Sequence, residues 1–230
     1  ARRDKSWTAQ GIATDDVLAQ VFAYDPLVGA SLRLIQAFGL RRKESVQCRP
    51  FEHVKPFTET GLPVEQQQAE QYLWVKGKGG RVRWVPLATP VQHAALELAQ
   101  QVVASRDAHM GAPDRDLKRN LRRFDYVLEK FGITLRERGA TGHGLRHERL
   151  NDAYEGITGL PSPVRGGGPV SPELDRAARL AVSQLAGHAR VRASGAYLGA
   201  IRRPSGRRGL PSDPPIGPKP DDNDAAAVEA

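Results

Sequence analysis

Apolar residues spaced three and four positions apart predict helices over the first fifty residues. A first helix is expected over residues 15–24 with Thr14 as its N-cap, because its apolar side chains fall on one face. Asp25-Pro26 provides an N-cap and a first-turn proline for a second helix, which should end at Gly39. A third helix is expected between Leu40 and Pro50.

Between residues 51 and 87 the pattern changes to one typical of strands. Residues 72–75 and 82–85 flank the glycine-rich turn Gly77-Lys78-Gly79-Gly80, and this arrangement is a hairpin signal. Lys78 is expected at the tip of the hairpin. Taken alone, a lysine in such a turn indicates only a solvated loop.

From residue 89 onward the helical pattern returns. Helices are expected after Thr89-Pro90, after Asp114, from His143 through Tyr154, and after Ser171-Pro172, the last of them ending at Gly187. These elements together predict an α+β fold that is mainly α, with a small antiparallel β-sheet or hairpin.

Composition divides the chain into three parts. Residues 1–13 are expected to be a linker, residues 14–203 a folded domain, and residues 204–230 a disordered tail rich in Pro, Gly and Asp. Within the domain, the proline- and glycine-rich residues 157–171 are expected to form a flexible loop.

The charge balance favours a polyanionic partner. The chain has 230 residues, of which 40% are apolar, and a formal net charge of +8. Residues 211–230 hold five acidic residues and one lysine, a net of −4 that leaves +12 for residues 1–210. Neutralised phosphates would supply sequence-independent affinity for such a surface, although a soluble arginine-rich surface has the same composition.

Apolar runs and cysteine content bear on where the protein acts. No run approaches the ~20 apolar residues that a membrane span needs, and the first residues lack the apolar region of a signal peptide. Cys48 is the single cysteine, so an internal disulfide is excluded and a reducing compartment is favoured. We therefore expect a cytoplasmic protein without membrane partners.

The stretch His143-Gly144-Leu145-Arg146-His147 carries the main chemical signal. On a helix, His143 and Arg146 are three residues apart and lie on one face, so a proton-transfer group and a fixed cation point at one spot. His143 and His147 beside Glu148 could also be metal ligands, but the His-Glu-x-x-His order and a further ligand cluster are missing. We expect no metal.

Other residues could complete a site for cleaving a phosphodiester without a metal. Arg41 and Arg146 could hold the nonbridging oxygens, because a guanidinium is always charged and binds bidentately. A tyrosine has an ordinary pKa of ~10 and needs a proton acceptor at neutral pH, for which His143 is a candidate. Lys78 could protonate the leaving oxygen.

Four stretches, taken together, resemble the motifs of the tyrosine recombinase, or phage integrase, family, and they cover about residues 35–200. They are Gly39-Leu40-Arg41 with Glu44, the lysine hairpin from Val75 to Leu87, the His-x-x-Arg box His143-Gly144-Leu145-Arg146, and Leu185-Ala186-Gly187-His188 with Tyr197 nine residues on. Tyr197 alone would indicate a half-buried structural residue, and its spacing from His188 changes that interpretation.

The resemblance implies the catalytic domain of such an enzyme over residues 14–203. Tyr197 would attack the scissile phosphate of DNA and form a 3′-phosphotyrosyl link, while Arg41, Arg146 and His188 would hold the phosphate. The bond energy is kept in this link, so the resemblance implies neither ATP nor a metal cofactor.

The remaining roles follow from the same resemblance. His143 would be the general base and Lys78 the general acid, Glu44 would orient Arg41, and His147 would support the site. The basic residues expected to contact DNA are Arg42, Lys76, Arg81, Arg83, Lys118, Arg119, Arg122, Arg190 and Arg192.

The implied partner is double-stranded DNA, bound by a homotetramer in the nucleoid of a bacterium, with integration or excision of a mobile element as the outcome. No DNA-binding domain precedes the motifs in this chain, so we expect either a fragment or another means of encircling the site. Two alternatives stay open: a DNA-binding accessory protein on the same fold that does not cut, and a type IB topoisomerase, which shares the chemistry.

Overall fold

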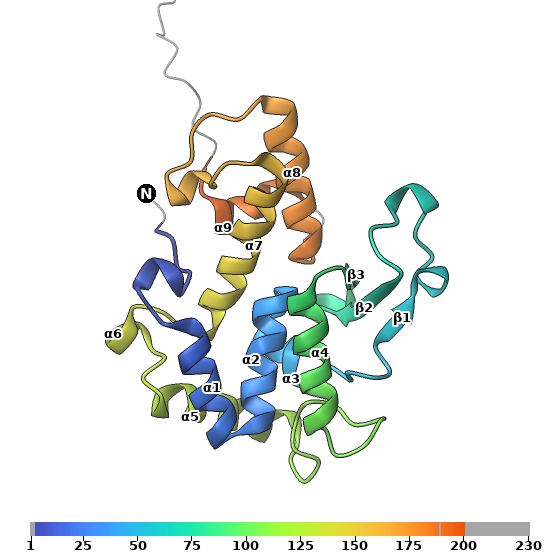
Figure 1. The fold of residues 1–230 in the computed structure, drawn as a ribbon, viewed down its shortest axis with the longest axis vertical. Helices are drawn as coiled ribbons and strands as arrows, with labels where there is room; N and C mark the ends of the chain where they lie inside the picture. The colour runs from blue at the N-terminus through green and yellow to red at the C-terminus, as the bar shows by residue number, and fades with distance from the viewer. Residues whose placement is uncertain (1–2, 189, 201–230) are drawn as a thin grey trace, which may run out of the picture.

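The computed structural model describes residues 3–188 and 190–200, and the side chain of Lys78 is not part of that description. The predicted tail over residues 204–230 lies outside the described residues. Within them the fold is mainly helical with a small antiparallel sheet on one flank, which confirms the predicted fold class (Figure 1). The helices are α1 (Thr14–Tyr24), α2 (Pro26–Phe38), α3 (Arg42–Val46), α4 (Pro90–Val102), α5 (Leu117–Lys130), α6 (Leu135–Arg138), α7 (Gly142–Thr158), α8 (Pro172–Leu185) and α9 (Gly195–Leu198).

Helices α1 and α2 are joined by Asp25, which caps α2 as the sequence predicts. Its Oδ1 accepts a hydrogen bond from the backbone N–H of Val28 at 3.2 Å. Gly29 lets the two helices approach closely, because a Cβ there would lie 2.4 Å from the Cα of Phe22. Gly39 ends α2 in the left-handed conformation, with φ +63°.

Helix α3 is shorter than the segment between Leu40 and Pro50 that the sequence predicts. Arg41 is extended and acts as the N-cap, and its backbone N–H donates to Oε2 of Glu44 at 2.8 Å. This bond satisfies a donor at the start of the helix and fixes where the helix begins. A similar shift occurs at α5, where Asp116 is the cap in place of Asp114.

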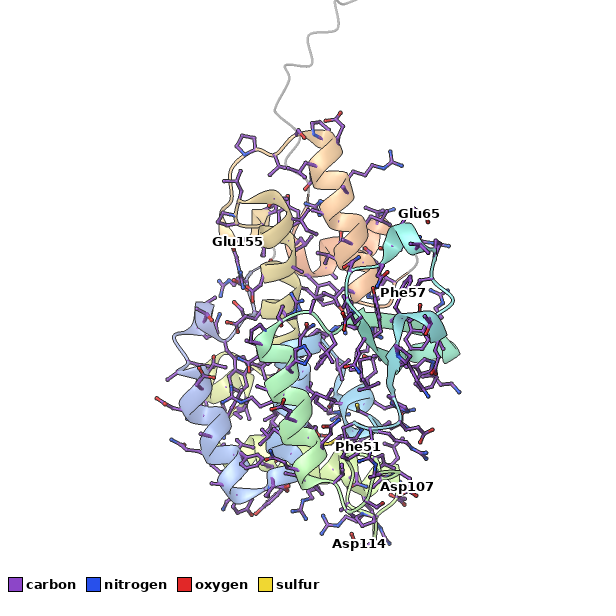
Figure 2. The ribbon with its side chains drawn as sticks, turned by 45° about the vertical axis from the view of Figure 1, so that its right-hand side comes forward. Phe51, Phe57, Glu65, Asp107, Asp114 and Glu155 are labelled. Carbon is purple, nitrogen blue, oxygen red and sulfur yellow. The ribbon has the colours of Figure 1, made fainter. Side chains whose placement is uncertain are left out.

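The predicted hairpin is present and belongs to a three-stranded sheet. The strands are β1 (Val54–Pro56), β2 (Gln71–Lys76) and β3 (Val82–Pro86), all antiparallel, with β2 in the centre. The turn between β2 and β3 is the 3-10 helix η4 (Lys78–Gly80), in which Gly79 and Gly80 have positive φ. The β1–β2 connection contains η2 (Phe57–Glu59) and η3 (Val64–Gln66), and Phe57 and Glu65 mark it in Figure 2.

The described residues before α1 are folded onto α7, although the sequence predicts a linker over residues 1–13. Trp7 is fully buried, and its Nε1 donates to the carbonyl of Thr141 at 2.8 Å. Its backbone N–H donates to Oε2 of Glu148 at 3.2 Å, and η1 (Thr8–Gln10) follows directly. This segment is therefore part of the folded domain, because burying an indole stabilises the contact by several kcal/mol, about 3–5.

Residues 157–171, which the sequence predicts to be a flexible loop, are anchored at two points. Ser162 is fully buried and donates from Oγ to Oδ1 of Asn151. Arg165, at the end of η5 (Pro163–Arg165), forms ion pairs with Asp4, Asp152 and Glu155. These contacts connect the loop to α7 and to the N-terminal segment.

Two hydrophobic cores organise the domain. The larger core joins α1 to α5 with the inner face of the sheet. The smaller core joins α7, α8 and α9, and its buried members are Leu150, Tyr154, Ala178, Val182, Ala186, Tyr197 and Leu198. The second core therefore packs Tyr197 among residues of α7 and α8.

Candidate active site

The first two turns of α7 hold the centre of the site. Arg146 and Leu145 are fully buried, whereas His143 remains exposed. Gly144 lets the N-terminal segment cross this turn, because a Cβ there would lie 2.5 Å from the carbonyl oxygen of Lys5. Gly142 similarly fits against Leu128, because a Cβ there would lie 2.8 Å from Cδ2 of Leu128. The glycines flanking His143 thus allow the helix start to be packed on two sides.

Arg146 contacts two distant parts of the chain. Its Nη1 donates to the carbonyl of Gly39, and its Nη2 donates to the carbonyl of Ala186 at 2.7 Å. Its Nε and Nη2 both donate to Oη of Tyr197, each at 3.3 Å. Burial lowers the pKa of Arg146, with the contact to Tyr197 acting in the opposite direction. The guanidinium nevertheless stays charged, because its ordinary pKa is above 12.

Arg41 reaches the same place from the cap of α3. Its Nη1 donates to Oε1 of Glu44 at 2.6 Å and its Nη2 to the carbonyl of Ala186 at 2.9 Å. The side chain is 27% exposed, so the guanidinium can reach a ligand outside the protein. The two arginines therefore meet at one backbone oxygen.

Three histidine rings surround Tyr197. The ring centroid of His147 lies 4.8 Å from that of Tyr197, His143 lies at 6.1 Å and His188 at 6.3 Å. Tyr197 is 7% exposed. Arg41, which donates to the same carbonyl as Arg146, completes this cluster. The structure thus brings together the predicted catalytic residues apart from Lys78, whose side chain lies outside the description.

The three histidines have lowered pKa values. His143 is exposed at its surface, but the protein around it removes part of its hydration, and this desolvation, followed by the charge of Arg146, lowers its pKa to about 4, with smaller effects from Lys5 and Arg41. Burial and the proximity of His143 lower the pKa of His147 to about 4 as well. The pKa of His188 is lowered by burial and then by Arg41 and Arg146. All three rings are neutral at pH 7 and can accept a proton.

Glu44 and Arg83 form a buried pair beneath Arg41. Arg83 donates from Nη1 to Oε1 of Glu44 at 3.1 Å and from Nη2 to Oε2 at 2.7 Å. Burial alone would raise the pKa of Glu44, but the hydrogen bonds and charge of Arg83, followed by those of Arg41, lower it to about 2. The sequence-based expectation that Arg83 contacts DNA is wrong, because its side chain is 8% exposed and its guanidinium is bound to Glu44.

The other residues predicted to contact DNA lie on the surface. Arg42 is exposed and paired with Asp125 of α5, which places this helix beside the start of α3. The remaining exposed members are Lys76, Arg81, Lys118, Arg119, Arg122, Arg190 and Arg192. Their solvent exposure leaves them able to bind phosphate groups.

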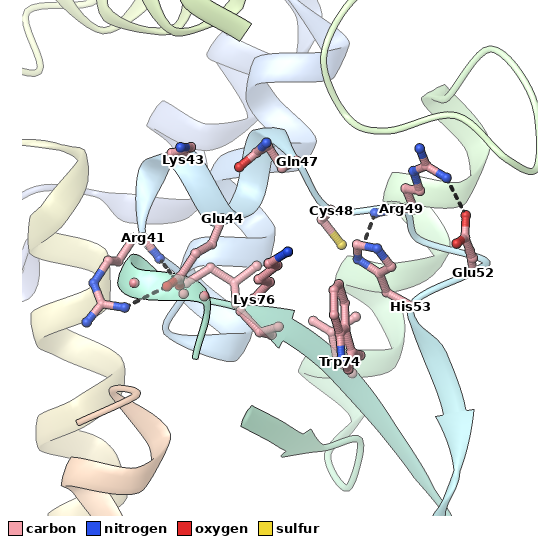
Figure 3. Close-up of a pocket in the computed structure, with 16 residues that line it drawn as sticks. Arg41, Lys43, Glu44, Gln47, Cys48, Arg49, Glu52, His53, Trp74 and Lys76 are labelled. Atoms are coloured by element: carbon pink, nitrogen blue, oxygen red, sulfur yellow. Dashed lines mark hydrogen bonds and ion pairs between the residues drawn. The ribbon is translucent and has the colours of Figure 1, made fainter. Parts of the chain in front are cut away.

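A groove of about 850 Å³ extends from Arg41 between α3 and the hairpin (Figure 3). Lys43, Arg49 and Lys76 line it together with Glu44 and Glu52. Arg49 is paired with Glu52 at 2.6 Å, so Lys43 and Lys76 extend the positive charge from Arg41. His53 and Trp74 meet edge to face on its wall, with ring centroids 4.7 Å apart. Sequence reasoning missed Lys43 and Arg49, although each is a cation close to the first arginine motif.

Sequence reasoning also missed the backbone carbonyls of Gly39 and Ala186, because main-chain atoms carry no residue-type signal. Lys5 was missed as well, and its charge lowers the pKa of His143 and His147. Among the residues that the structure describes, no group of three or more His, Cys, Asp or Glu side chains could hold a metal ion. No helix in this part of the chain is both long and apolar enough to cross a bilayer.

The fold and the cluster of two arginines, three histidines and a tyrosine resemble those of proteins that rearrange DNA. A comparison with known protein families tests this resemblance. A family model described as "Integrase" matches residues 5–152. That is more than half of the chain, and the chain therefore belongs to the integrase family of tyrosine recombinases. The match includes Arg41, Lys78, His143 and Arg146 and ends before Tyr197.

Two solved structures of the XerH site-specific recombinase are similar to this chain. One is the pre-cleavage complex with difH substrate, at 14% identity and a TM-score of 0.46, covering 82% of this chain and 49% of that one. The other is the post-cleavage complex with palindromic difH substrate, at 15% identity and a TM-score of 0.45, covering 82% and 48%. The chain thus spans about half the length of these solved chains. No curated protein matches the sequence.

Proposed function

We propose that the chain is a site-specific DNA recombinase that cuts and rejoins DNA through a 3′-phosphotyrosyl intermediate, with integration or excision of a mobile element as the outcome. The observation that carries the proposal is the contact between Tyr197 and Arg146. The phenol Oη lies 3.3 Å from both Nε and Nη2 of Arg146, a buried cation suited to a phosphate. A phosphate held by this guanidinium would lie within reach of the phenol.

Arg41 and Arg146 would stabilise the charge that develops on the nonbridging oxygens. Both guanidiniums are held by fixed groups, Arg41 by Glu44 and Arg146 by the carbonyl of Gly39, so they need little reorganisation during the reaction. Donors fixed in this way contribute roughly 10²–10³-fold each to the rate of such reactions. His188 would add a further hydrogen bond to the phosphate.

The proton and bond changes balance within the site. Oη of Tyr197 forms a bond to phosphorus and gives its proton to His143, which is neutral at pH 7 because its pKa is about 4. The bond between phosphorus and the 5′ oxygen breaks, and that oxygen takes a proton from Lys78. Rejoining reverses these steps with a 5′ hydroxyl as the nucleophile. His143 is exposed and can pass its proton to solvent, whereas His147 is buried against Tyr197 and would orient it.

The proposal extends to the setting of the reaction. The partner is double-stranded DNA, bound by a homotetramer in the nucleoid of a bacterial cytoplasm, and the catalytic domain includes the segment that Trp7 anchors to α7 as well as the residues from 14 onward. Tyr197 lies against Arg146 of its own chain, so each protomer would cut with its own tyrosine. The exposed basic residues of the hairpin and of α5 support DNA as the partner.

The test traps the covalent intermediate. DNA sites are first selected from a random duplex library with the full chain, and the best site is rebuilt with a nick just beyond each candidate cleavage position. Incubation in EDTA without nucleotide, followed by a denaturing gel, should show a protein–DNA adduct that Tyr197→Phe abolishes. Tyr154→Phe is the matched control, since Tyr154 is a buried tyrosine of the same core whose hydroxyl contacts Asp175 at 2.6 Å.

The alternatives predict different results. Binding to the selected site without an adduct would overturn cleavage and favour an accessory DNA-binding protein. An adduct on any sequence, with relaxation of supercoiled plasmid, would overturn site-specific recombination and favour a type IB topoisomerase. Absence of any selected DNA would overturn the proposed partner itself.

A further inference from the structure

Arg83 has a buried side chain on β3 and lies next to Glu44 of the first arginine motif. It lies on β3 opposite Val75, and its side chain is 8% exposed. Both of its terminal nitrogens are bound to the carboxylate of Glu44. Its Nε has no hydrogen-bond partner within the described residues. A cation in this position is committed to Glu44 and is not available to a phosphate.

Glu44 transmits this contact to the arginines of the site. Its Oε1 accepts from Nη1 of Arg41 at 2.6 Å, and its Oε2 accepts from the backbone N–H of Arg41 at 2.8 Å. Nη1 of Arg146 lies 3.9 Å from the same Oε2. One carboxylate thus faces three guanidiniums, and its orientation is fixed by the bidentate bonds from Arg83.

Two glycines bring the hairpin and the closing motif against this pair. A Cβ on Gly77 would lie 3.2 Å from Oε1 of Glu44 and 3.4 Å from Nη1 of Arg41. A Cβ on Gly187 would lie 3.0 Å from Nη1 of Arg83. The base of the hairpin that carries Lys78 and the turn that precedes His188 therefore both pack on the same ion pair.

We propose that Arg83 is a positioning residue that fixes Glu44, and through it Arg41, relative to the lysine hairpin and the closing motif. This inference rests on the proposed function, since it concerns the geometry of the phosphate site. Arg83 would act on the rate of cleavage without touching DNA. Misplacing a catalytic group by about 1 Å costs on the order of 100-fold in rate, which sets the scale of the expected effect.

The first experiment separates cleavage from binding. Arg83→Met should lower the single-turnover rate of adduct formation by about 100-fold and leave DNA affinity and its salt dependence unchanged. Arg83→Lys keeps the charge but cannot bind a carboxylate bidentately, so its cleavage rate should lie between those of the wild type and Arg83→Met. Arg81→Met, an exposed neighbour in the same hairpin, should show the opposite behaviour, with weaker binding and a shallower salt dependence.

The second experiment is a pH profile that loss of stability alone would not change. The charged groups facing Glu44 are Arg83, Arg41 and Arg146. Burial raises the pKa of Glu44, and Arg83 is the main group that lowers it. Without Arg83, the pKa of Glu44 should therefore rise from about 2. Protonation then releases Arg41, so cleavage by Arg83→Met should fall as the pH is lowered, at a pH where the wild type is unaffected. Arg83→Met combined with Glu44→Gln should be slow at every pH without that fall.

A measurement without DNA keeps the inference testable if cleavage is very slow. Carboxyl NMR titration of the folded Arg83→Lys protein should show the Glu44 resonance titrating at a higher pH than in the wild type. Normal cleavage by Arg83→Met, or loss of DNA binding with a smaller salt dependence, would overturn the inference. An absence of adduct in the wild type would instead overturn the proposed function.

Discussion

The Nη2 atoms of Arg41 and Arg146 both donate to one oxygen, the carbonyl of Ala186, at 2.9 and 2.7 Å. These residues are 105 positions apart in the sequence: Arg41 is the N-cap of α3, and Arg146 lies in α7. Ala186 precedes the Gly187-His188 turn, so the closing motif sets the spacing of the two guanidiniums. The proposed phosphate site would therefore be assembled only when α8 and its C-terminal turn are in place.

Arg146→Lys should abolish most of the cleavage activity. A lysine amine cannot bind the carbonyls of Gly39 and Ala186 and the hydroxyl of Tyr197 together, as the guanidinium does. We expect a loss of about 100-fold or more in the single-turnover rate. Arg149→Lys is the matched control on the same helix, because Arg149 donates to the carbonyl of Ala37 and does not contact Tyr197. Equal losses in the two variants would contradict the assignment.

The pH dependence of cleavage should reflect the lowered pKa of His143. A neutral histidine accepts the phenol proton, so the rate should fall only as the pH approaches about 4 and should show no inflection near the ordinary value of 6.5. His143→Gln should lower the rate by about 100-fold or more and remove the fall in rate near pH 4. The rate is measured by quenching adduct formation across the pH range. An inflection near 6.5 that disappears in His143→Gln would contradict the lowered pKa.

His147 should make the folding stability depend on pH. Its pKa is about 4 in the folded protein and near 6.5 when unfolded, so the unfolded state binds more protons between those values. The free energy of unfolding should therefore rise with pH across this window, by up to about 3 kcal/mol, and level off above it. Urea denaturation followed by circular dichroism measures this. His147→Gln should reduce the slope and leave the part that His143 contributes through its own lowered pKa, and an unchanged slope would show that His147 does not contribute.

The sequence predicts those elements whose signals are local. Asp25-Pro26, Gly39 and the hairpin over residues 72–85 are all found where the pattern places them, because caps, positive-φ glycines and strand alternation act within a few residues. Arg146 and Tyr197 are 51 positions apart, and no local signal joins them. They were placed in one site because four motifs, taken together, resemble those of a known family.

Other features depend on long-range packing and could not be predicted in the same way. Trp7 lacks any periodic neighbour, yet it is buried against Gly144. Arg165 anchors a glycine-rich loop through ion pairs with Asp4 and Asp152 that composition does not indicate. For Arg83 a signal existed, since strand alternation places it on the buried face with Val85, but its charge favoured a surface position.

Lys78 as general acid can be tested through the leaving group. Lys78→Ala should slow adduct formation on ordinary DNA by about 100-fold or more. A substrate with sulfur in place of the scissile 5′ oxygen has a thiolate leaving group that needs no proton, so it should restore the rate of this variant. Lys76→Ala, an exposed lysine of the same hairpin, should show no such rescue. If the sulfur substrate fails to restore Lys78→Ala, the lysine has another role.

Gly187 and Gly159 offer a matched pair for testing the closing turn. Both have φ +69°, so alanine at either position should cost about 1–2 kcal/mol in folding stability. A Cβ on Gly159 meets no atom within 4 Å, whereas a Cβ on Gly187 would lie 3.0 Å from Nη1 of Arg83. Gly187→Ala should therefore also displace the carbonyl of Ala186 and lower the cleavage rate by about 100-fold.

Urea denaturation and single-turnover cleavage of both variants make the comparison. Similar losses of stability with a loss of cleavage confined to Gly187→Ala would separate backbone strain from displacement of the site. Equal effects of the two substitutions on cleavage would mean that strain alone explains them, because the contact with Arg83 is the local difference between the two positions. The position of one backbone turn would then no longer account for the spacing of Arg41 and Arg146.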